Sequence, residues 1–310
     1  MTVSPTANVP SEMIQDPVFA ERGLAEQQLW WQEEATQAEL AAQLRSHNFV
    51  VIDDFLPPEL AASLAEDLRV IYAGGHPPED GPLGDFELIR GRHTGWLDPL
   101  KPDAEAWSAS LPVVARRLDQ VVRQLRLARH EIDREEPILP ELSDVELRGR
   151  VMVAVHPAKT VRLVGDAEDP DAAMVQTRFD ASVRHTDNDC LGGVGARCNG
   201  RRLTVLLYLS SNWGEGLGGK LRVFGPDATG LLAGWFGWMV AESAPQVDLA
   251  PKFGRLVLMW SDNRAPHLVT PIGRAAPSRM LMTAFYYSAA ELAIYNQTGS
   301  LERLRSFKRR

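Results

Sequence analysis

Cysteine is nearly absent from this chain, which has two in 310 residues, Cys190 and Cys198. Two thiols do not make the disulfide framework that stabilises small secreted domains. They lie in a glycine-rich stretch in which a disulfide between them is geometrically conceivable. We expect both to be reduced thiols in a cytosolic protein.

The sequence also lacks an apolar run of about 18 residues, the length that could span a bilayer. Residues 1–20 have no basic start and no apolar centre, and their prolines are unlike a secretory signal. The net charge of −8 argues against a nucleic-acid-binding surface over the whole molecule. We therefore expect a soluble, cytoplasmic protein with no membrane or nucleic-acid partner, and the sequence leaves the oligomeric state open.

What is present indicates an α+β fold. Helical spacing of apolar residues predicts helices over about 24–45, 57–73 and 114–125. Strand-like segments at 49–52 and 88–96 lie among the helices, and the others follow them at 151–155, 182–187, 203–209, 220–224, 255–260 and 280–287. Helices first and strands later favour a β-sandwich buttressed by helices. We divide the chain into a flexible arm (1–23), a helical support region with early strands (24–145), a β-rich core (146–290) and a C-terminal helix or tail (291–310).

Three polar side chains in the β-rich part suggest a metal site. His185 and Asp187 are two residues apart, so in a strand both project to the same side. His267 follows the apolar run 256–260 and a short polar turn, which suits a third ligand from a distant strand. Two histidines and one carboxylate occupy one face of an octahedral Fe(II) and leave the opposite positions open for a co-substrate and O2.

Arg279 strengthens this interpretation, because a lone His-x-Asp is usually just a hydrogen-bonded pair. It opens the strand-like segment 279–287, where a guanidinium could hold the far carboxylate of 2-oxoglutarate with two hydrogen bonds. Zinc is the main rival metal, because imidazole and carboxylate also suit it. Zinc alone gives Arg279 no role, so the residues favour an iron- and 2-oxoglutarate-dependent oxygenase.

With these residues assembled, the chain resembles the hypoxia-type prolyl hydroxylases from about Leu40 to Tyr287. The matching motifs are 51–56, Ile89-Arg90-Gly91, Trp96, 183–188, 218–224, 251–253 and 260–267. The resemblance implies a double-stranded β-helix core, or jelly roll, behind N-terminal helices. It also implies Fe(II), 2-oxoglutarate and O2 as cofactors, with ascorbate as a stimulant of turnover.

The resemblance implies a role for several residues. His185, Asp187 and His267 match the iron ligands, and Arg279 and Tyr208 match the residues that bind the C5 carboxylate of 2-oxoglutarate. Further co-substrate residues are His156, which stands where the family has a tyrosine, and the pocket walls Leu206, Leu221, Val269 and Thr283. The substrate candidates are Arg201, with Arg202 nearly as good a match, Trp96 and Phe285.

Two segments are longer than in the family. The first spans 157–184, where the family grips its substrate, and the second spans 225–247. The second contains Trp235, Phe236, Trp238 and Met239, which we expect to form a satellite core under a long loop, with a lid or partner-contact patch as the alternative.

The resemblance implies hydroxylation of a prolyl residue in a protein or peptide, with decarboxylation of 2-oxoglutarate to succinate and CO2. Because both long segments bear on the substrate, two alternatives stay open. One is the same chemistry on a free amino acid or small metabolite. The other is a non-catalytic module that senses 2-oxoglutarate or oxygen. An open groove would favour a peptide, and a capped cavity a metabolite.

Overall fold

The computed structural model describes residues 33–73, 87–89, 92–101, 104–130, 135–156, 182, 184–188, 199–226, 245–273 and 276–293. Its helices are α1 (Glu34–His47), α2 (Pro58–Tyr72), α3 (Ala104–Trp107) and α4 (Ser110–Leu127), with 3-10 turns at Pro140–Leu142 and Glu215–Leu217. Its strands are β1 (Phe49–Ile52), β2 (Glu87–Ile89), β3 (Arg92–Leu97), β4 (Val145–Arg148), β5 (Val151–His156), β6 (Arg201–Tyr208), β7 (Leu221–Phe224), β8 (Pro245–Leu249), β9 (Leu256–Trp260), β10 (His267–Val269) and β11 (Arg279–Ser288).

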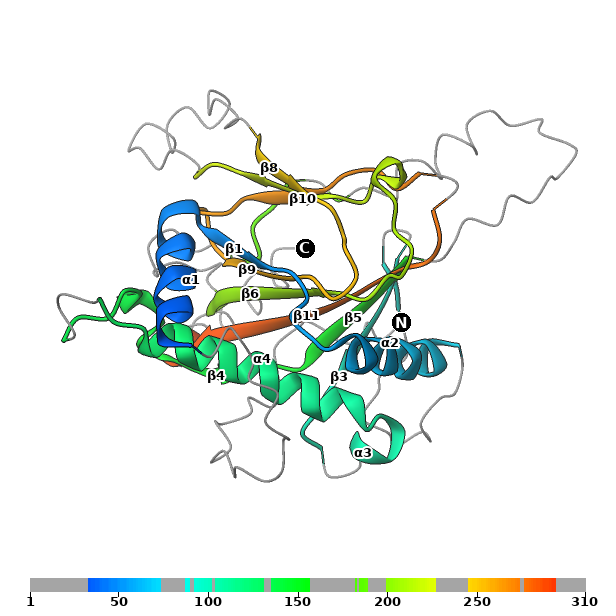
Figure 1. Ribbon diagram of the computed structural model, residues 1–310, viewed down its shortest axis with the longest axis horizontal. Coiled ribbons are helices and arrows are strands. Elements are labelled where there is room, and N and C mark those ends of the chain that lie inside the picture. The colour runs from blue at the N-terminus through cyan, green and yellow to red at the C-terminus, as the bar shows by residue number, and fades with distance from the viewer. Residues whose placement is uncertain are drawn as a thin grey trace, which may run out of the picture.

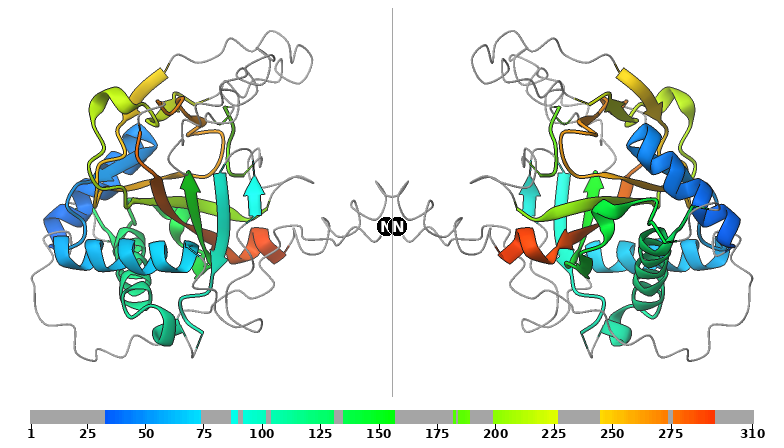
Figure 2. Two further views of the ribbon diagram at one scale, coloured as in Figure 1. Left: turned by 90° about the vertical axis from the view of Figure 1, so that its right-hand side faces the viewer. Right: turned by 90° about the vertical axis from the view of Figure 1, so that its left-hand side faces the viewer.

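The strands form two antiparallel sheets. The large sheet has the order β1-β9-β6-β11-β5-β3-β2, and β4 also pairs with β11. The small sheet has the order β10-β7-β8. It lies on one side of the large sheet, and α2 and α4 lie on the other (Figures 1 and 2). This arrangement confirms the predicted α+β class, with helices that support a β-rich core.

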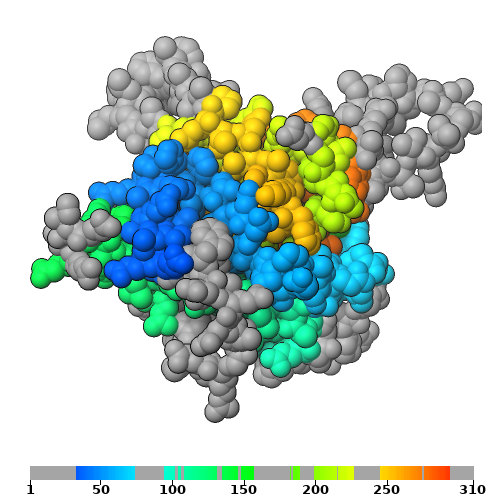
Figure 3. Space-filling view, viewed as in Figure 1, coloured from blue at the N-terminus to red at the C-terminus, as the bar shows by residue number. Residues whose placement is uncertain are grey.

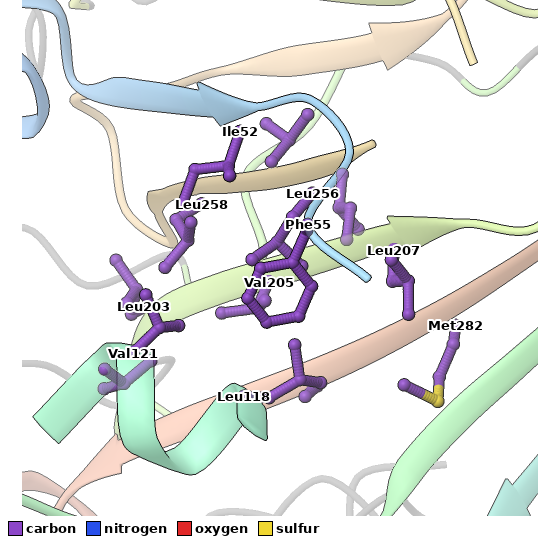
Figure 4. Packing of buried hydrophobic residues seen from close by; sticks show 14 of the residues in the cluster. Ile52, Phe55, Leu118, Val121, Leu203, Val205, Leu207, Leu256, Leu258 and Met282 are labelled. Carbon is purple, nitrogen blue, oxygen red and sulfur yellow. The ribbon is translucent and has the colours of Figure 1, made fainter. Parts of the chain in front are cut away.

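The helix-facing side of the large sheet carries the hydrophobic core. Strand alternation places one set of apolar side chains on this side, where they pack against Phe55 and against Leu118 and Val121 of α4 (Figure 4). That set includes Ile52, Leu203, Val205, Leu207, Leu256, Leu258 and Met282. Full burial of one such side chain contributes about 1.5–3 kcal/mol. The helices therefore hold the large sheet firmly, and they also form much of the molecular surface in the view of Figure 3.

The opposite side of the large sheet faces the small sheet. On β11, Arg279, Leu281 and Thr283 alternate with the core residues. In the register of the sheet, Leu281 lies opposite Tyr208 of β6, and Thr283 lies opposite Leu206. These residues therefore share one face, between the two sheets.

A tight turn at Gly218 and Gly219 lies beside residues 270–273. Gly218 and Gly219 have φ angles of +69° and +65°, which side-chain-bearing residues rarely adopt. A Cβ atom on Gly218 would lie 2.0 Å from the carbonyl oxygen of Pro271. Only glycine allows the turn to approach residues 270–273 so closely.

Some predicted boundaries were wrong. The segment predicted as a strand at 182–187 forms, in its described residues, a single β-bridge, between His185 and His267. It does not continue as a strand because three residues later the backbone N–H of Asn188 bonds to a different partner, the carbonyl of Ser261. The strand predicted at 88–96 is, in the described residues, two strands, β2 and β3, which pair antiparallel. α4 starts at Ser110, earlier than its apolar spacing suggested.

Several predictions concern residues outside the described ranges. These are the arm 1–23, the start of the helix predicted from about residue 24, the thiols Cys190 and Cys198, the aromatics of the second long segment, most of both long segments and most of the C-terminal helix or tail. Among the described helices, none is both long and apolar enough to cross a membrane.

Candidate metal and co-substrate site

His185, Asp187 and His267 come together where β10 meets the segment before residue 189. One ligand atom from each lies within 4.8 Å of the other two. Two backbone hydrogen bonds of 2.9 Å pair His185 with His267, and their ring centroids are 4.4 Å apart. The two carboxylate oxygens of Asp187 face different rings: Oδ1 is 3.9 Å from Nε2 of His185, and Oδ2 is 3.7 Å from Nε2 of His267.

A hydrogen bond fixes the tautomer of His267. Its Nδ1 lies 3.0 Å from the carbonyl oxygen of Ala265, which can only accept, so Nδ1 carries the proton. The lone pair is then on Nε2, the atom that faces Asp187. Second partners of this kind commonly orient metal-binding imidazoles.

The electrostatics of the site favour the deprotonated forms of Asp187 and His267. Burial raises the pKa of Asp187, but the nearby His267, Arg201 and His185 and the hydrogen bond from Thr204 outweigh it and leave this pKa below its usual range. Burial lowers the pKa of His267, helped by His185 and opposed by Asp187. A metal needs a neutral imidazole and an ionised carboxylate, so both shifts favour metal binding.

Hydrogen bonds hold Asp187 at three points. Thr204 Oγ1 donates to Oδ2 at 2.8 Å, and Asn199 Nδ2 donates to the backbone carbonyl of Asp187 at 2.7 Å. The next backbone N–H, that of Asn188, donates to the carbonyl of Ser261 at 2.7 Å. The carboxylate is therefore rigidly placed, and the donor set suits Fe(II) as well as zinc.

Arg279 lies at the start of β11 and is only 1% exposed. Its guanidinium carbon is 5.4 Å from the ring centroid of Tyr208, and a Cβ atom on Gly219 would lie 3.4 Å from its Cδ. Burial raises the pKa of Tyr208, although Arg279 and Arg255 oppose this shift. Tyr208 therefore stays a protonated hydrogen-bond donor beside a buried cation.

The surroundings of Arg279 fit a carboxylate ligand. The hydroxyl groups of Tyr208 and Thr283 are buried and have no hydrogen-bond partner among the described residues. A carboxylate would give these hydroxyls an acceptor, and it would lie beside a buried cation. The other predicted pocket residues are near: His156 lies opposite Arg279 in the register, Leu206 opposite Thr283, and Leu221 opposite Val269.

The three substrate candidates form one cluster. The guanidinium carbon of Arg201 lies 3.8 Å from the ring centroid of Phe285, and the Phe285 and Trp96 rings are 6.2 Å apart. A bulge in β6 decides between the two arginines, because Tyr286 pairs with Leu203 and Tyr287 with Arg201. Arg202, skipped by the bulge, forms an ion pair of 2.5 Å with Glu291. Arg201 is therefore the arginine in this cluster.

Sequence reasoning missed the residues that support the ligands. Thr204, Asn199 and Ser261 belong to no metal-binding motif, and Trp213 packs beside Gly219. Two of them had a signal in the sequence: Ser261 lies in the matching motif 260–267, and Thr204 alternates with Leu206 and Tyr208 along one strand.

Part of the chain, including the three candidate metal ligands, matches a known family. Residues 175–287 match the family described as the 2OG-Fe(II) oxygenase superfamily. The chain is 26% identical over 258 residues to the human Egl nine homolog 1, covering 81% of this chain and 46% of that protein. It is 25% identical over 256 residues to the hypoxia-inducible factor prolyl hydroxylase of Caenorhabditis elegans, covering 80% and 28%. The chain thus spans about half the length of the curated relatives that it matches first.

A solved structure shares the fold. It is a prolyl hydroxylase from Trichoplax adhaerens in complex with a hypoxia inducible factor peptide fragment, with a TM-score of 0.57, 20% identity, and coverage of 87% of this chain and 97% of that one. In sequence this chain is similar to the C. elegans prolyl hydroxylase, in fold it is similar to the T. adhaerens prolyl hydroxylase, and its residues 175–287 match the 2OG-Fe(II) oxygenase superfamily.

Proposed function

We propose that this protein is an Fe(II)- and 2-oxoglutarate-dependent dioxygenase that hydroxylates a prolyl residue in a protein or peptide. The observation that carries the proposal is the meeting of His185, Asp187 and His267 within 4.8 Å, on the side of the large sheet that also holds the buried Arg279. The two antiparallel sheets on either side of this site would be the two halves of a double-stranded β-helix.

Two groups of residues bind the metal and the co-substrate. His185, Asp187 and His267 hold the metal. Arg279 and Tyr208 bind the far carboxylate of 2-oxoglutarate, and the Thr283 hydroxyl and His156 offer further polar contacts on the same face.

Bound Fe(II), 2-oxoglutarate and O2 supply the oxidation, in which a substrate C–H becomes C–OH while 2-oxoglutarate becomes succinate and CO2. The chain's own part is to orient the co-substrate and to exclude water. The buried side chains of Leu206 and Leu221 and the half-buried Val269 serve the second purpose.

A prolyl substrate is favoured by the cluster of Arg201, Phe285 and Trp96. The partly exposed Trp96, which packs against the buried Phe285, offers an apolar surface for a pyrrolidine ring, and the guanidinium of Arg201 can donate to a peptide carbonyl beside it. The names of the relatives point the same way, since the C. elegans protein is a prolyl hydroxylase.

Incubation of the protein with Fe(II), 2-oxoglutarate and O2 tests the proposal. The substrates are a panel of proline-containing peptides, the same peptides with alanine for proline, and free amino acids. We expect a mass gain of one oxygen on a proline-containing peptide, with one succinate per oxygen added, and no gain with the His267→Ala variant.

The other outcomes identify the alternatives. Oxygen gain only on a free amino acid would replace the peptide by a small metabolite and leave the chemistry unchanged. Binding of 2-oxoglutarate without succinate formation on any substrate would refute the enzyme and favour a sensing module.

A further inference from the structure

Behind the candidate metal site lies a short relay of two hydroxyl groups. Thr204 Oγ1 is 2.8 Å from Oδ2 of Asp187 and also 2.8 Å from Oγ of Ser261. Thr204 is 1% exposed and Ser261 is fully buried, so water does not compete for either bond.

The chemistry of the groups sets the direction of both bonds. An ionised carboxylate only accepts, so the one hydroxyl hydrogen of Thr204 goes to Asp187. Thr204 Oγ1 must then accept from Ser261, whose hydroxyl hydrogen points at it. The relay therefore runs from Ser261 through Thr204 to Oδ2 of Asp187.

Ser261 connects this relay to the backbone around the site. Its N–H donates to the carbonyl of Arg202 at 3.1 Å, and its carbonyl accepts from the N–H of Asn188 at 2.7 Å. Ser261 follows β9 directly, and Thr204 pairs with Met259 of that strand. The hydroxyls thus rest on two paired strands of the large sheet, which cannot shift independently.

We propose that Thr204 is a positioning residue that keeps Asp187 a one-oxygen ligand of the metal, with Ser261 orienting the Thr204 hydroxyl. The two oxygens of Asp187 face different imidazoles at 3.7 and 3.9 Å, so a carboxylate that is free to rotate could offer both to one ion. The hydrogen bond from Thr204 engages Oδ2 and restrains this rotation.

The number of open positions on the metal depends on this restraint. Three protein atoms leave three positions of an octahedral ion open, enough for a chelating 2-oxo acid and O2. A second oxygen from Asp187 would take one of them. This inference rests on the metal site of the proposed function and adds how that site is kept open.

Metal binding without turnover tests the relay. The probe is Co(II), titrated calorimetrically into the metal-free full chain, followed by 2-oxoglutarate titrated into the Co(II)-loaded protein. Thr204→Val keeps the shape and removes the hydroxyl. We expect its Kd for Co(II) to rise about 10- to 100-fold, the usual effect of losing such a partner, and its Kd for 2-oxoglutarate to rise as well.

Two related variants and a control separate positioning from general damage. Thr204→Ser keeps the hydroxyl and should bind Co(II) as the wild type does, while Ser261→Ala should give a smaller loss. In the control, Ser110→Ala removes a hydroxyl from another internal pair, in which Ser63 and Ser110 lie 2.7 Å apart between α2 and α4. It should leave the Kd for Co(II) unchanged.

The binding constants of these variants can overturn the proposed relay or the proposed function. Unchanged Co(II) binding in Thr204→Val, or failure of Thr204→Ser to restore binding, would overturn the relay. If circular dichroism shows that Thr204→Val does not fold, Ser261→Ala decides, and wild-type affinity in that variant would overturn the proposal. A wild-type chain that binds no Co(II) would refute the proposed function itself.

Discussion

Replacing Gly219 with alanine should weaken the binding of 2-oxoglutarate without touching it directly. The new Cβ atom would lie 3.0 Å from Cζ2 of Trp213, 3.3 Å from Cγ1 of Ile272 and 3.4 Å from Cδ of Arg279. The first two distances are tighter than ordinary contacts, so a neighbour must move by a few tenths of an ångström. Trp213 resists, because its Nε1 donates to the carbonyl of Gly218 at 3.0 Å.

Two effects add up in this variant. A side chain at φ +65° costs about 1–2 kcal/mol of folding free energy. Because Trp213 resists, we expect the backbone at residue 219 to move instead, toward Arg279, which the new Cβ atom already contacts at 3.4 Å. A misplacement of about 1 Å can cost roughly 100-fold at a binding or catalytic site, so a shift of a few tenths of an ångström at Arg279 should raise the Kd for 2-oxoglutarate about fivefold.

Gly254→Ala is the matched control. Gly254 has a φ of +76°, but a Cβ atom there would meet nothing within 4 Å. Both variants should lose similar stability in urea unfolding, and only Gly219→Ala should bind 2-oxoglutarate more weakly in calorimetry of the Co(II)-loaded protein. Equal Kd values in the two variants would refute the idea that this turn positions Arg279.

Three further predictions concern charged groups. Arg279→Met should raise the Kd for 2-oxoglutarate at least about 30-fold, because losing one partner of a buried charged pair costs about 2–5 kcal/mol; an unchanged Kd in calorimetry would mean that another residue binds the carboxylate. Asp119→Ala should lower the free energy of unfolding by about 3–5 kcal/mol in urea, because it strands the 3% exposed Arg148 without its carboxylate partner; a loss below about 1 kcal/mol would contradict this. A hydrogen bond from Arg255 lowers the pKa of Asp53, so the stability from this half-exposed pair is present above the unfolded-state pKa and disappears as the pH falls through the folded-state value. Between pH 6 and pH 3 the free energy of unfolding, measured in urea, should therefore decrease less for Arg255→Met than for the wild type. An equal decrease in the two proteins would exclude this linkage.

The sequence predicted the parts of the site that depend on local order. His185 and Asp187 are close because they are two residues apart, and His267 follows a strand whose apolar run is evident. Gly218 and Gly219, both in the matching motif 218–224, have positive φ angles that few other residues adopt. The division into domains and the cytoplasmic location stay predictions.

The parts that the sequence could not predict depend on pairing between distant strands. Thr204 supports Asp187 only because the register of β6 against β9 and β11 turns its hydroxyl to that face. The choice of Arg201 over Arg202 follows from a bulge that skips one residue, which no local pattern marks. The prediction of a strand at 182–187 was wrong because the alternation of its side chains cannot show that the backbone hydrogen-bond partner changes from His267 to Ser261.

The most direct test is a diffraction experiment on crystals grown without O2 in the presence of Mn(II) and 2-oxoglutarate, with the ion located by its anomalous signal. We expect one ion within bonding distance of Nε2 of His185, Nε2 of His267 and one oxygen of Asp187, with the far carboxylate of 2-oxoglutarate bound to Arg279. An ion bound elsewhere, or a 2-oxoglutarate that does not reach Arg279, would contradict this expectation.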